Sequence, residues 1–276
     1  MHYGLYALQD VRGALKLSCK VRDNASRFTG DGLMTILDDL LTTLDMDTTV
    51  KDIRLGLFHT GVVTRFCGLA STLPRDSLKQ RPLFAPLVEE PGFLLDKTVD
   101  ELTRLCYSEN IPEAAIGMAT VNSLIDIDER LCTVLNAGDL IAEKGAGKRI
   151  AIVGHFPFVP KLRKIAKEFW VIEKNPVEGD LEEAAAEEVL PKADVVGITG
   201  ATLTNHTFDQ VVGLCRPEAF VVLLGDSTPL SSVLFDHGVD VVAGTQVIDP
   251  DLAMRCVGQG ATFRQVKGRR PLTMAK

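Results

Sequence analysis

The chain has 276 residues, enough for one large domain or two modest ones. Hydrophobic residues make up 46% of it and charged residues 24%, which is ordinary for a globular protein with a buried core. The formal net charge of −7 argues against a nucleic acid or an anionic membrane as partner, because such partners favour a basic face.

The chain has six cysteines at irregular spacing, and none of them forms a CxxC pair. This usage is typical of reduced core residues in a cytosolic protein. The N-terminal segment carries Asp10 and Arg12 in its apolar part, so it lacks the uncharged core of a secretory signal. No stretch approaches the ~18 uninterrupted apolar residues of a membrane span. These features predict a cytoplasmic protein.

The first half of the chain predicts a small α/β domain over residues 31–140, preceded by a poorly patterned extension over residues 1–30. Apolar residues at helical spacing predict an amphipathic helix from residue 33 to residue 44. Residues 53–67 indicate a β-hairpin with its turn at His59, Thr60 and Gly61, and residues 73–97 an irregular connection. Two helices follow over residues 98–107 and 111–124, and small residues in the second one favour close packing.

The second half, residues 141–276, predicts a parallel sheet. Glycine and charge over residues 137–148 indicate the domain boundary. Five short apolar runs then alternate with helical segments, as in a doubly wound sheet. The expected strands cover residues 149–153, 169–173, 194–199, 220–224 and 239–242. The expected helices cover residues 158–168, 181–190, 207–214, 229–235 and 249–259, with Asn205 and Asp249 as N-caps of the third and fifth.

Four of these strands end in small and polar residues. The carboxyl ends of parallel strands lie on one edge of the sheet, where ligands of α/β proteins bind. Tight turns explain any single strand end, but four together favour a ligand-binding edge. The residues are Gly154 and His155 after the first strand, Glu173 after the second, Thr199, Gly200 and Thr202 after the third, and Gly225, Asp226, Ser227 and Thr228 after the fourth.

The sequence argues against a dinucleotide at this edge. Glu173 stands 19 residues after Gly154, near the offset of a ribose-binding acid. The segment GHFPFV, however, has one glycine and a proline where G-x-G-x-x-G is needed. A nucleoside-type ligand such as S-adenosylmethionine, or no nucleotide, therefore fits better than NAD. The alternative for Glu173 is a solvated acid at a strand end.

No pair of histidines has the spacing of a zinc motif. A dispersed metal site drawn from His59, Cys67, His155 and Glu173 stays open. Ser227 lies outside the G-x-S-x-G pattern, which disfavours a serine hydrolase.

Several long motifs, in the expected order, resemble a known family over roughly residues 31–266. IVGHFPFVPKLRK, VIEKNPVEGDLEE, LPKADVVGITGATLTNHTFDQ and LLGDSTPLSSVLFDHGVDVVAGT resemble the DUF364 family. IRLGLFHTGVVT, FCGLAST and AAIGMATVNSL resemble DUF4213, its usual N-terminal partner. The resemblance implies an enolase-N-terminal-like α/β domain followed by a Rossmann-like domain, with the candidate site in the cleft between them. The positions that match the family motifs are His59, Thr60, Asn122, Gly154, His155, Glu173, Thr199, Gly200, Thr202, Asn205, Gly225, Asp226, Ser227 and Thr228.

The family description, "putative heavy-metal chelation", implies a heavy-metal ion or a metal chelate as the ligand. The leading hypothesis is therefore a protein that binds a small molecule, a metal or a metal chelate in the interdomain cleft. An enzyme with a nucleoside-type cofactor such as S-adenosylmethionine is the second hypothesis, and a ligand sensor or scaffold without turnover is the third. The sequence leaves catalysis open, and a homodimer is the prior for the assembly.

Overall fold

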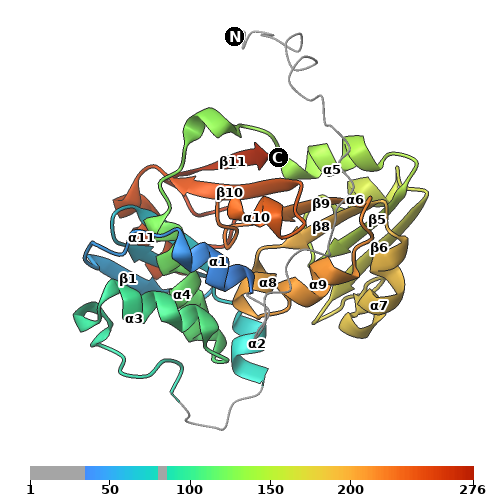
Figure 1. The fold of residues 1–276 in the computed structure, drawn as a ribbon. Helices are drawn as coiled ribbons and strands as arrows, with labels where there is room; N and C mark the ends of the chain where they lie inside the picture. Colours follow the sequence, from blue (N-terminus) through green and yellow to red (C-terminus); the bar gives the residue numbers. More distant parts are fainter. Residues whose placement is uncertain (1–34, 80–85) are drawn as a thin grey trace, which may run out of the picture.

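A computed structural model describes residues 35–79 and 86–276, and the predicted extension over residues 1–30 lies outside them. The chain forms a three-stranded antiparallel sheet from its first half and an eight-stranded, mostly parallel sheet from its second half (Figure 1). The predicted mixed α/β class is confirmed, whereas the names enolase-N-terminal-like and Rossmann-like stay predictions. In the described part of the chain, no helix has both the length and the apolar character needed to cross a membrane.

The three-stranded sheet has the order β1 (Asp52–Leu55), β2 (His59–Val63) and β3 (Cys67–Ser71), and α1 (Ile36–Thr42) precedes it. The predicted turn at His59 is wrong, because His59, Thr60 and Gly61 lie inside β2. The chain turns instead at residues 56–58, where the Gly56 N–H donates to the carbonyl of His59 at 2.9 Å. A side chain at Gly56 would overlap with the carbonyl of Val257, so this turn needs a glycine.

Helix α4 (Ile111–Leu124) has the predicted bounds and is buried along almost its whole length. It packs between β3 and the short helices α3 (Val99–Arg104) and η3 (Leu105–Tyr107). The predicted close approach is confirmed on both sides of α4. A Cβ at Gly117 would overlap with the backbone of Cys106, and one at Gly68 with the backbone of Ala119. The rest of this half consists of α2 (Pro74–Lys79), η2 (Leu94–Asp96) and η4 (Glu129–Leu131).

The eight-stranded sheet has the order β4-β11-β10-β9-β8-β5-β6-β7. All five predicted strands are confirmed: β5 (Arg149–Val153), β6 (Glu168–Glu173), β8 (Val195–Thr199), β9 (Phe220–Leu224) and β10 (Val241–Val247). Two short strands, β4 (Cys132–Thr133) and β7 (Leu181–Glu182), form its edges. The sequence did not reveal β11 (Arg269–Ala275), because two arginines and Pro271 interrupt its apolar pattern. Pro271 is tolerated there because β4 pairs only with Thr273 and Met274.

The helices of the second half differ from the predictions at several places, and the helices predicted over residues 158–168 and 229–235 are shorter than expected. Residues 137–148, where the domain boundary is predicted, contain a helix that the sequence did not reveal, α5 (Ala137–Gly145), whose N-cap is Asn136. The helix expected over residues 181–190 is broken into β7, η5 (Glu183–Ala185), α7 (Ala186–Val189) and η6 (Leu190–Lys192). Asn205 does not cap the helix that follows it; it ends α8 (Ala201–Thr204), and Thr207 precedes α9 (Phe208–Leu214).

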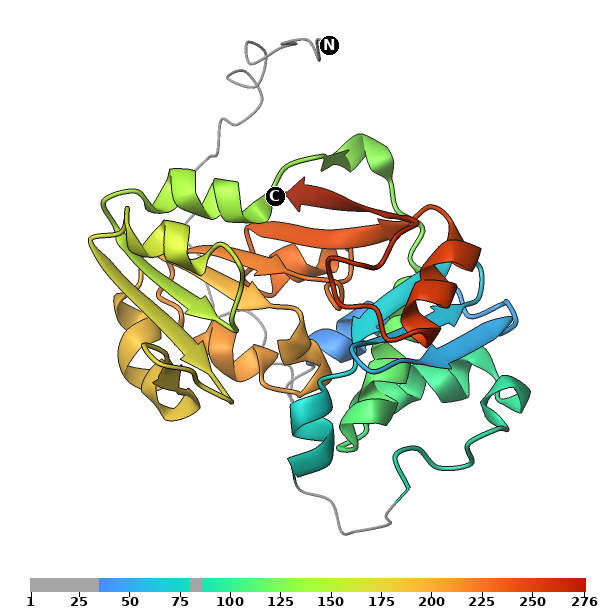
Figure 2. The same ribbon diagram turned by 180° about the vertical axis from the view of Figure 1, so that it is seen from behind.

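The remaining helices are α6 (Val159–Arg163), α10 (Val233–Asp236) and α11 (Pro250–Gly258). The predicted cap of α11 is confirmed, since the side chain of Asp249 accepts a hydrogen bond from the N–H of Leu252. Helix α11 lies against the three-stranded sheet (Figure 2), where Val257 packs with Leu69. A larger apolar cluster runs from Ile36 and Met118 to Val196 and Leu272, so both halves share one core.

The strand order reverses beside β5. The chain runs outward from β5 to β6 and β7, then returns to the other side of β5 and continues through β8, β9 and β10. Such a reversal opens a crevice at the carboxyl ends of the two central strands. The loops that follow β5 and β8 flank this crevice.

Candidate functional site

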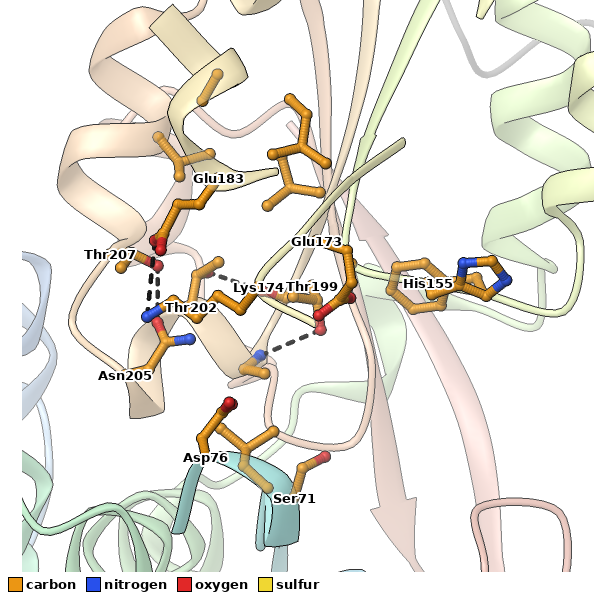
Figure 3. A pocket seen from close by; sticks show the side chains of 18 residues that line it. Ser71, Asp76, His155, Glu173, Lys174, Glu183, Thr199, Thr202, Asn205 and Thr207 are labelled. Atoms are coloured by element: carbon orange, nitrogen blue, oxygen red, sulfur yellow. Dashed lines mark hydrogen bonds and ion pairs between the residues drawn. The ribbon is translucent and has the colours of Figure 1, made fainter. Parts of the chain in front are cut away.

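A pocket of about 220 Å³ lies at the carboxyl ends of β5, β6 and β8, at the point where the strand order reverses (Figure 3). Segments of the first half complete it, through the end of β3 and helix α2. Its apolar lining consists of Leu73, Val153, Phe156, Ile172, Ala186, Ala201 and Val211. Its other lining residues are Ser71, Asp76, Gly154, His155, Glu173, Lys174, Glu183, Thr199, Thr202, Asn205 and Thr207.

One wall of the pocket carries hydroxyl and amide groups from β8 and the α8–α9 turn. The Thr202 hydroxyl donates to the carbonyl of Thr199 at 2.7 Å, and the Thr207 hydroxyl donates to Oδ1 of Asn205 at 2.7 Å. The Thr207 N–H donates to the carbonyl of Thr202 at 3.0 Å. These bonds fix the hydroxyl oxygens while leaving them lone pairs with which to accept hydrogen bonds from a ligand.

Carboxylates lie on more than one side of the pocket: Asp76 and Glu173 lie away from this wall, whereas Glu183 lies beside Asn205 and Thr207 (Figure 3). Asn175 links two carboxylates, because its side-chain amide donates to Asp76 at 2.9 Å and its N–H donates to Glu173 at 3.3 Å. Lys174 lies 3.6 Å from Glu183, a partly exposed ion pair that contributes little to stability. The pocket thus has three carboxylates and one lysine, a balance that favours cationic or neutral ligands over anions.

The loop after β5 forms the third side. Gly154 has a φ of +101°, and a Cβ there would lie 3.0 Å from the side chain of Thr199, so only glycine fits. His155 follows it, with Nδ1 2.9 Å from a carboxylate oxygen of the buried Asp180. The ring of His155 lies on the far side of Glu173 from Asn205 (Figure 3).

The remaining predicted site residues lie outside this pocket, most of them in a buried polar junction between the two halves. His59 Nε2 lies 3.1 Å from Asp226 Oδ2, and both side chains are almost fully buried. The contact lacks the alignment of a hydrogen bond, so it is electrostatic only, and only when His59 is protonated. Asp226 Oδ1 accepts from the Thr245 hydroxyl and lies 3.4 Å from Arg269.

The junction borders the pocket through two contacts. The Ser71 N–H donates to the Ser227 hydroxyl at 2.8 Å, and Ser71 lines the pocket. Gly200 packs against Thr228 so closely that a Cβ would overlap with the Thr228 hydroxyl. Of the six buried polar side-chain atoms without a hydrogen-bond partner in the described part of the chain, four belong to residues of this junction: Asn122 Oδ1, Asp226 Oδ2, Thr228 Oγ1 and Arg269 Nε.

The structure thus divides the predicted residues into two groups. Those that line the pocket are Gly154, His155, Glu173, Thr199, Thr202 and Asn205. Those that do not are His59, Thr60, Asn122, Gly200, Gly225, Asp226, Ser227 and Thr228; Thr60 pairs with the Thr72 hydroxyl at 3.2 Å. Sequence reasoning missed the contributions of Ser71, Asp76, Glu183 and Thr207 to the pocket. Lys174 belongs to the strand-end segment 173–175 that the sequence singles out, although it has no predicted binding role of its own.

Three histidines connect the two halves. Besides His59, His206 Nε2 lies 2.8 Å from the carbonyl of Cys106, and His237 Nε2 lies 2.6 Å from Asp39 on α1. Each of these contacts joins a residue before position 126 to one after position 200.

The side chains in the described part of the chain do not form a cluster for a bare heavy-metal ion. In residues 35–79 and 86–276, no group of three or more His, Cys, Asp and Glu side chains is arranged to hold one. Burial, together with the nearby charges of Asp52 and Asp38, raises the pKa of Cys67 and of Cys106 to about 12. Both thiols are therefore protonated at neutral pH, whereas a soft metal needs the thiolate.

The fold and the pocket define a mixed α/β protein with a pocket at a reversal of strand order. The chain belongs to the DUF364 family, described as "Putative heavy-metal chelation", whose model matches residues 136–276. The model of DUF4213, with the same description, matches residues 37–125.

Two solved structures of the DUF364 family and one curated protein are similar to this chain. A crystal structure of a DUF364 protein of unknown function from Desulfitobacterium hafniense is similar, with a TM-score of 0.73 and 26% identity, over 87% of this chain and 97% of that one. A DUF364 protein from Pyrococcus horikoshii shares the fold, with a TM-score of 0.74 and 24% identity, over 87% and 98% of the two chains. An uncharacterized protein of Methanocaldococcus jannaschii is 29% identical over 167 residues, which is 58% of this chain and 64% of that protein, less than two thirds of its length.

Proposed function

We propose that this protein binds a metal chelate, or its organic chelator, in the pocket between its two halves. The observation that carries the proposal is the position of the pocket. It lies where the strand order reverses, and its walls combine hydroxyl, amide and carboxylate groups from both halves. The family description supports a role in metal handling.

The chemistry of the side chains favours a chelate over a bare ion. The described residues supply no cluster of metal donors, and the two buried thiols stay protonated. A chelate brings its own donor atoms, so the protein needs only to recognise the outer surface of the complex. Hydroxyls such as Thr202 and carboxylates such as Glu173 can accept hydrogen bonds from amine or amide groups of the chelator.

The charge of the pocket lining narrows the class of chelate that fits the pocket. Asp76, Glu173 and Glu183 face a single lysine, and that lysine already pairs with Glu183. A polyanionic chelate would meet repulsion here. A neutral or cationic chelate, such as a complex of a divalent ion with amino-acid ligands, fits better.

The test is a thermal-shift and calorimetric titration with three kinds of probe: Ni²⁺, Cu²⁺ and Zn²⁺ alone, metal-free histidine, and the histidine complexes of the three ions. At a hundred times the dissociation constant, a bound ligand stabilises the folded state by about 2.7 kcal/mol. We expect this shift with a chelate and not with its components. Equal binding of the bare ions, or no binding of any probe, refutes the proposal.

A matched pair of variants locates the binding. Both Thr202 and Thr204 are buried in the same short helix, but only Thr202 lines the pocket, and the Thr204 hydroxyl has no hydrogen-bond partner in the described part of the chain. We expect Thr202→Val to weaken chelate binding by about tenfold, the size of one lost hydrogen bond. Thr204→Val should leave binding unchanged. Equal effects of the two variants would place the ligand elsewhere.

One observation favours a second candidate, an enzyme that uses a nucleoside-type cofactor such as S-adenosylmethionine. Glu173 lines the pocket at the end of β6, where an acid can accept hydrogen bonds from ribose hydroxyls. Titration with S-adenosylmethionine and S-adenosylhomocysteine tests this. Binding that is lost in Glu173→Gln and kept in Glu182→Gln, a control on the edge strand β7, would favour the cofactor; no binding would exclude it.

The location and assembly stay predictions. We infer a cytoplasmic protein that forms a homodimer and binds no nucleic acid, from composition, charge and the general preference for twofold assemblies. Light scattering after size-exclusion chromatography measures the mass of the assembly.

A further inference from the structure

His206 occupies the turn between α8 and α9 with a left-handed backbone. Its φ is +59°, and only two other non-glycine residues in the described part of the chain, Leu73 and Glu90, have positive values. This conformation is costly for a residue with a Cβ, and a glycine would adopt it without the cost. The turn alone therefore does not require a histidine.

The imidazole adds a contact that a glycine cannot make. Nε2 lies 2.8 Å from the carbonyl oxygen of Cys106, and in the tautomer that carries the proton on Nε2 it donates a hydrogen bond to that oxygen. Cys106 is a rigid anchor, because η3 lies directly on α4 at Gly117, where no side chain fits. The ring thus ties the turn to η3, which packs on the buried helix α4 of the other half.

The two neighbours of His206 in the sequence, Asn205 and Thr207, both line the pocket. Their side chains bond to one another, and the Thr207 N–H reaches back to Thr202. The direction in which these groups point depends on the backbone of the turn. A change at position 206 therefore acts on the hydroxyl and amide wall without any contact between His206 and a ligand.

We propose that His206 is a positioning residue for the pocket: its bond to the Cys106 carbonyl holds the left-handed turn that aims Asn205 and Thr207 at the ligand. This role rests on the proposed function for the identity of the ligand. The conformational order of the turn, however, can be measured in the protein without any ligand. The position of the first half thereby controls the geometry of a wall built by the second half.

Four variants distinguish a histidine that holds the turn through its bond to Cys106 from a histidine that merely occupies the turn. His206→Ala keeps the strain and loses the ring, His206→Gly loses both, and His206→Gln keeps a side-chain N–H donor of similar reach. His237→Ala is the control, because it removes another contact between the halves, to Asp39, at a residue that does not line the pocket.

The first measurement is amide hydrogen exchange at Thr207 in the protein without ligand. We expect faster exchange in the Ala and Gly variants, wild-type exchange in the Gln variant, and no change at Thr207 in His237→Ala. The Gly variant should exchange fast even where it melts no lower than wild type, because relief of backbone strain offsets the lost bond. Wild-type exchange in the Gly variant overturns the proposal.

The second measurement is titration with the nickel–histidine complex. We expect about tenfold weaker binding in the Ala and Gly variants, the size of one lost hydrogen bond, and wild-type affinity in the Gln and His237→Ala variants. If wild-type protein binds no chelate, the proposed function fails, while the exchange experiment still decides the role of His206. If chelates bind equally to all variants, His206 does not position the pocket.

Discussion

Asp194 offers the sharpest quantitative prediction. It stands just before β8, at the end of the sheet opposite the pocket, and it joins three strands. Its carboxylate accepts bonds from the backbone and guanidinium of Arg149, at the start of β5, at 2.9–3.1 Å, and lies 2.6 Å from Arg216, before β9. The bonds from Arg149 lower the pKa of Asp194 from 3.8 to about 2.

The size of the effect follows from linkage. A drop of about two pKa units corresponds to at most about 2.4 kcal/mol of folding free energy, and the partly exposed arginines reduce it to about 1–2 kcal/mol. Because the pKa is lower in the folded state, this stabilisation is complete above the unfolded pKa near 4. It falls as the pH drops towards 2, and about half of it is lost by pH 3.

Urea unfolding of wild-type protein and Asp194→Asn from pH 7 to pH 3 measures this dependence. We expect the variant to be less stable by about 1–2 kcal/mol at pH 7, and the difference to shrink by about half at pH 3. Asp139→Asn, which breaks an exposed pair with Lys161, is the control and should change little at any pH. A difference between wild type and Asp194→Asn that stays constant with pH would refute the reasoning.

Three other substitutions or reactions test the packing and the pocket. Gly117→Ala should destabilise the protein by about 3 kcal/mol or more, because the new methyl group overlaps with the Cys106 backbone; thermal unfolding measures it. Gly154→Ala should cost about 1–3 kcal/mol through its positive φ and should also weaken chelate binding, whereas Gly147→Ala, with positive φ but open space, should affect stability alone. Cys67 and Cys106 should resist iodoacetamide at pH 8 until the protein unfolds, since burial keeps their pKa at about 12; peptide mass spectrometry detects any labelling of the folded protein.

The sequence predicted the elements whose pattern is local. The β-branched runs of β5, β8 and β9 and the capped helix α11 follow from alternation, turn residues and the Asp249 cap. The sequence did not predict the elements whose existence or position depends on tertiary contacts. Strand β11 exists because β10 offers it a pairing edge, and the turn before β2 falls at Gly56 because α11 leaves no room for a side chain there.

The sequence predicted only some of the residues that line the pocket, because only some of them follow from a local pattern. The rule that ligands bind at strand ends located Glu173, Thr199 and Thr202, which line the pocket. It could not separate them from Asp226 and Ser227, because the same strand-end pattern also produces a turn that the other half of the chain buries. The contributions of Ser71 and Asp76 depend on how the two halves pack, which no local pattern encodes.

The shared core has a consequence for how the two family segments behave apart. The matches meet near residue 130, yet Met118 and Val196 belong to one apolar cluster, and α11 covers the sheet of the other segment. Residues 136–276 also hold an apolar cluster of their own, which includes Ile141, Val171 and Val222, but the shared cluster and the packing of α11 join the two segments. We therefore expect a single cooperative transition in calorimetry, with equal van't Hoff and calorimetric enthalpies. The two family models match separate segments, but we expect the chain to unfold as one cooperative unit, and residues 136–276 expressed alone to aggregate through the exposed faces of the sheet and α11.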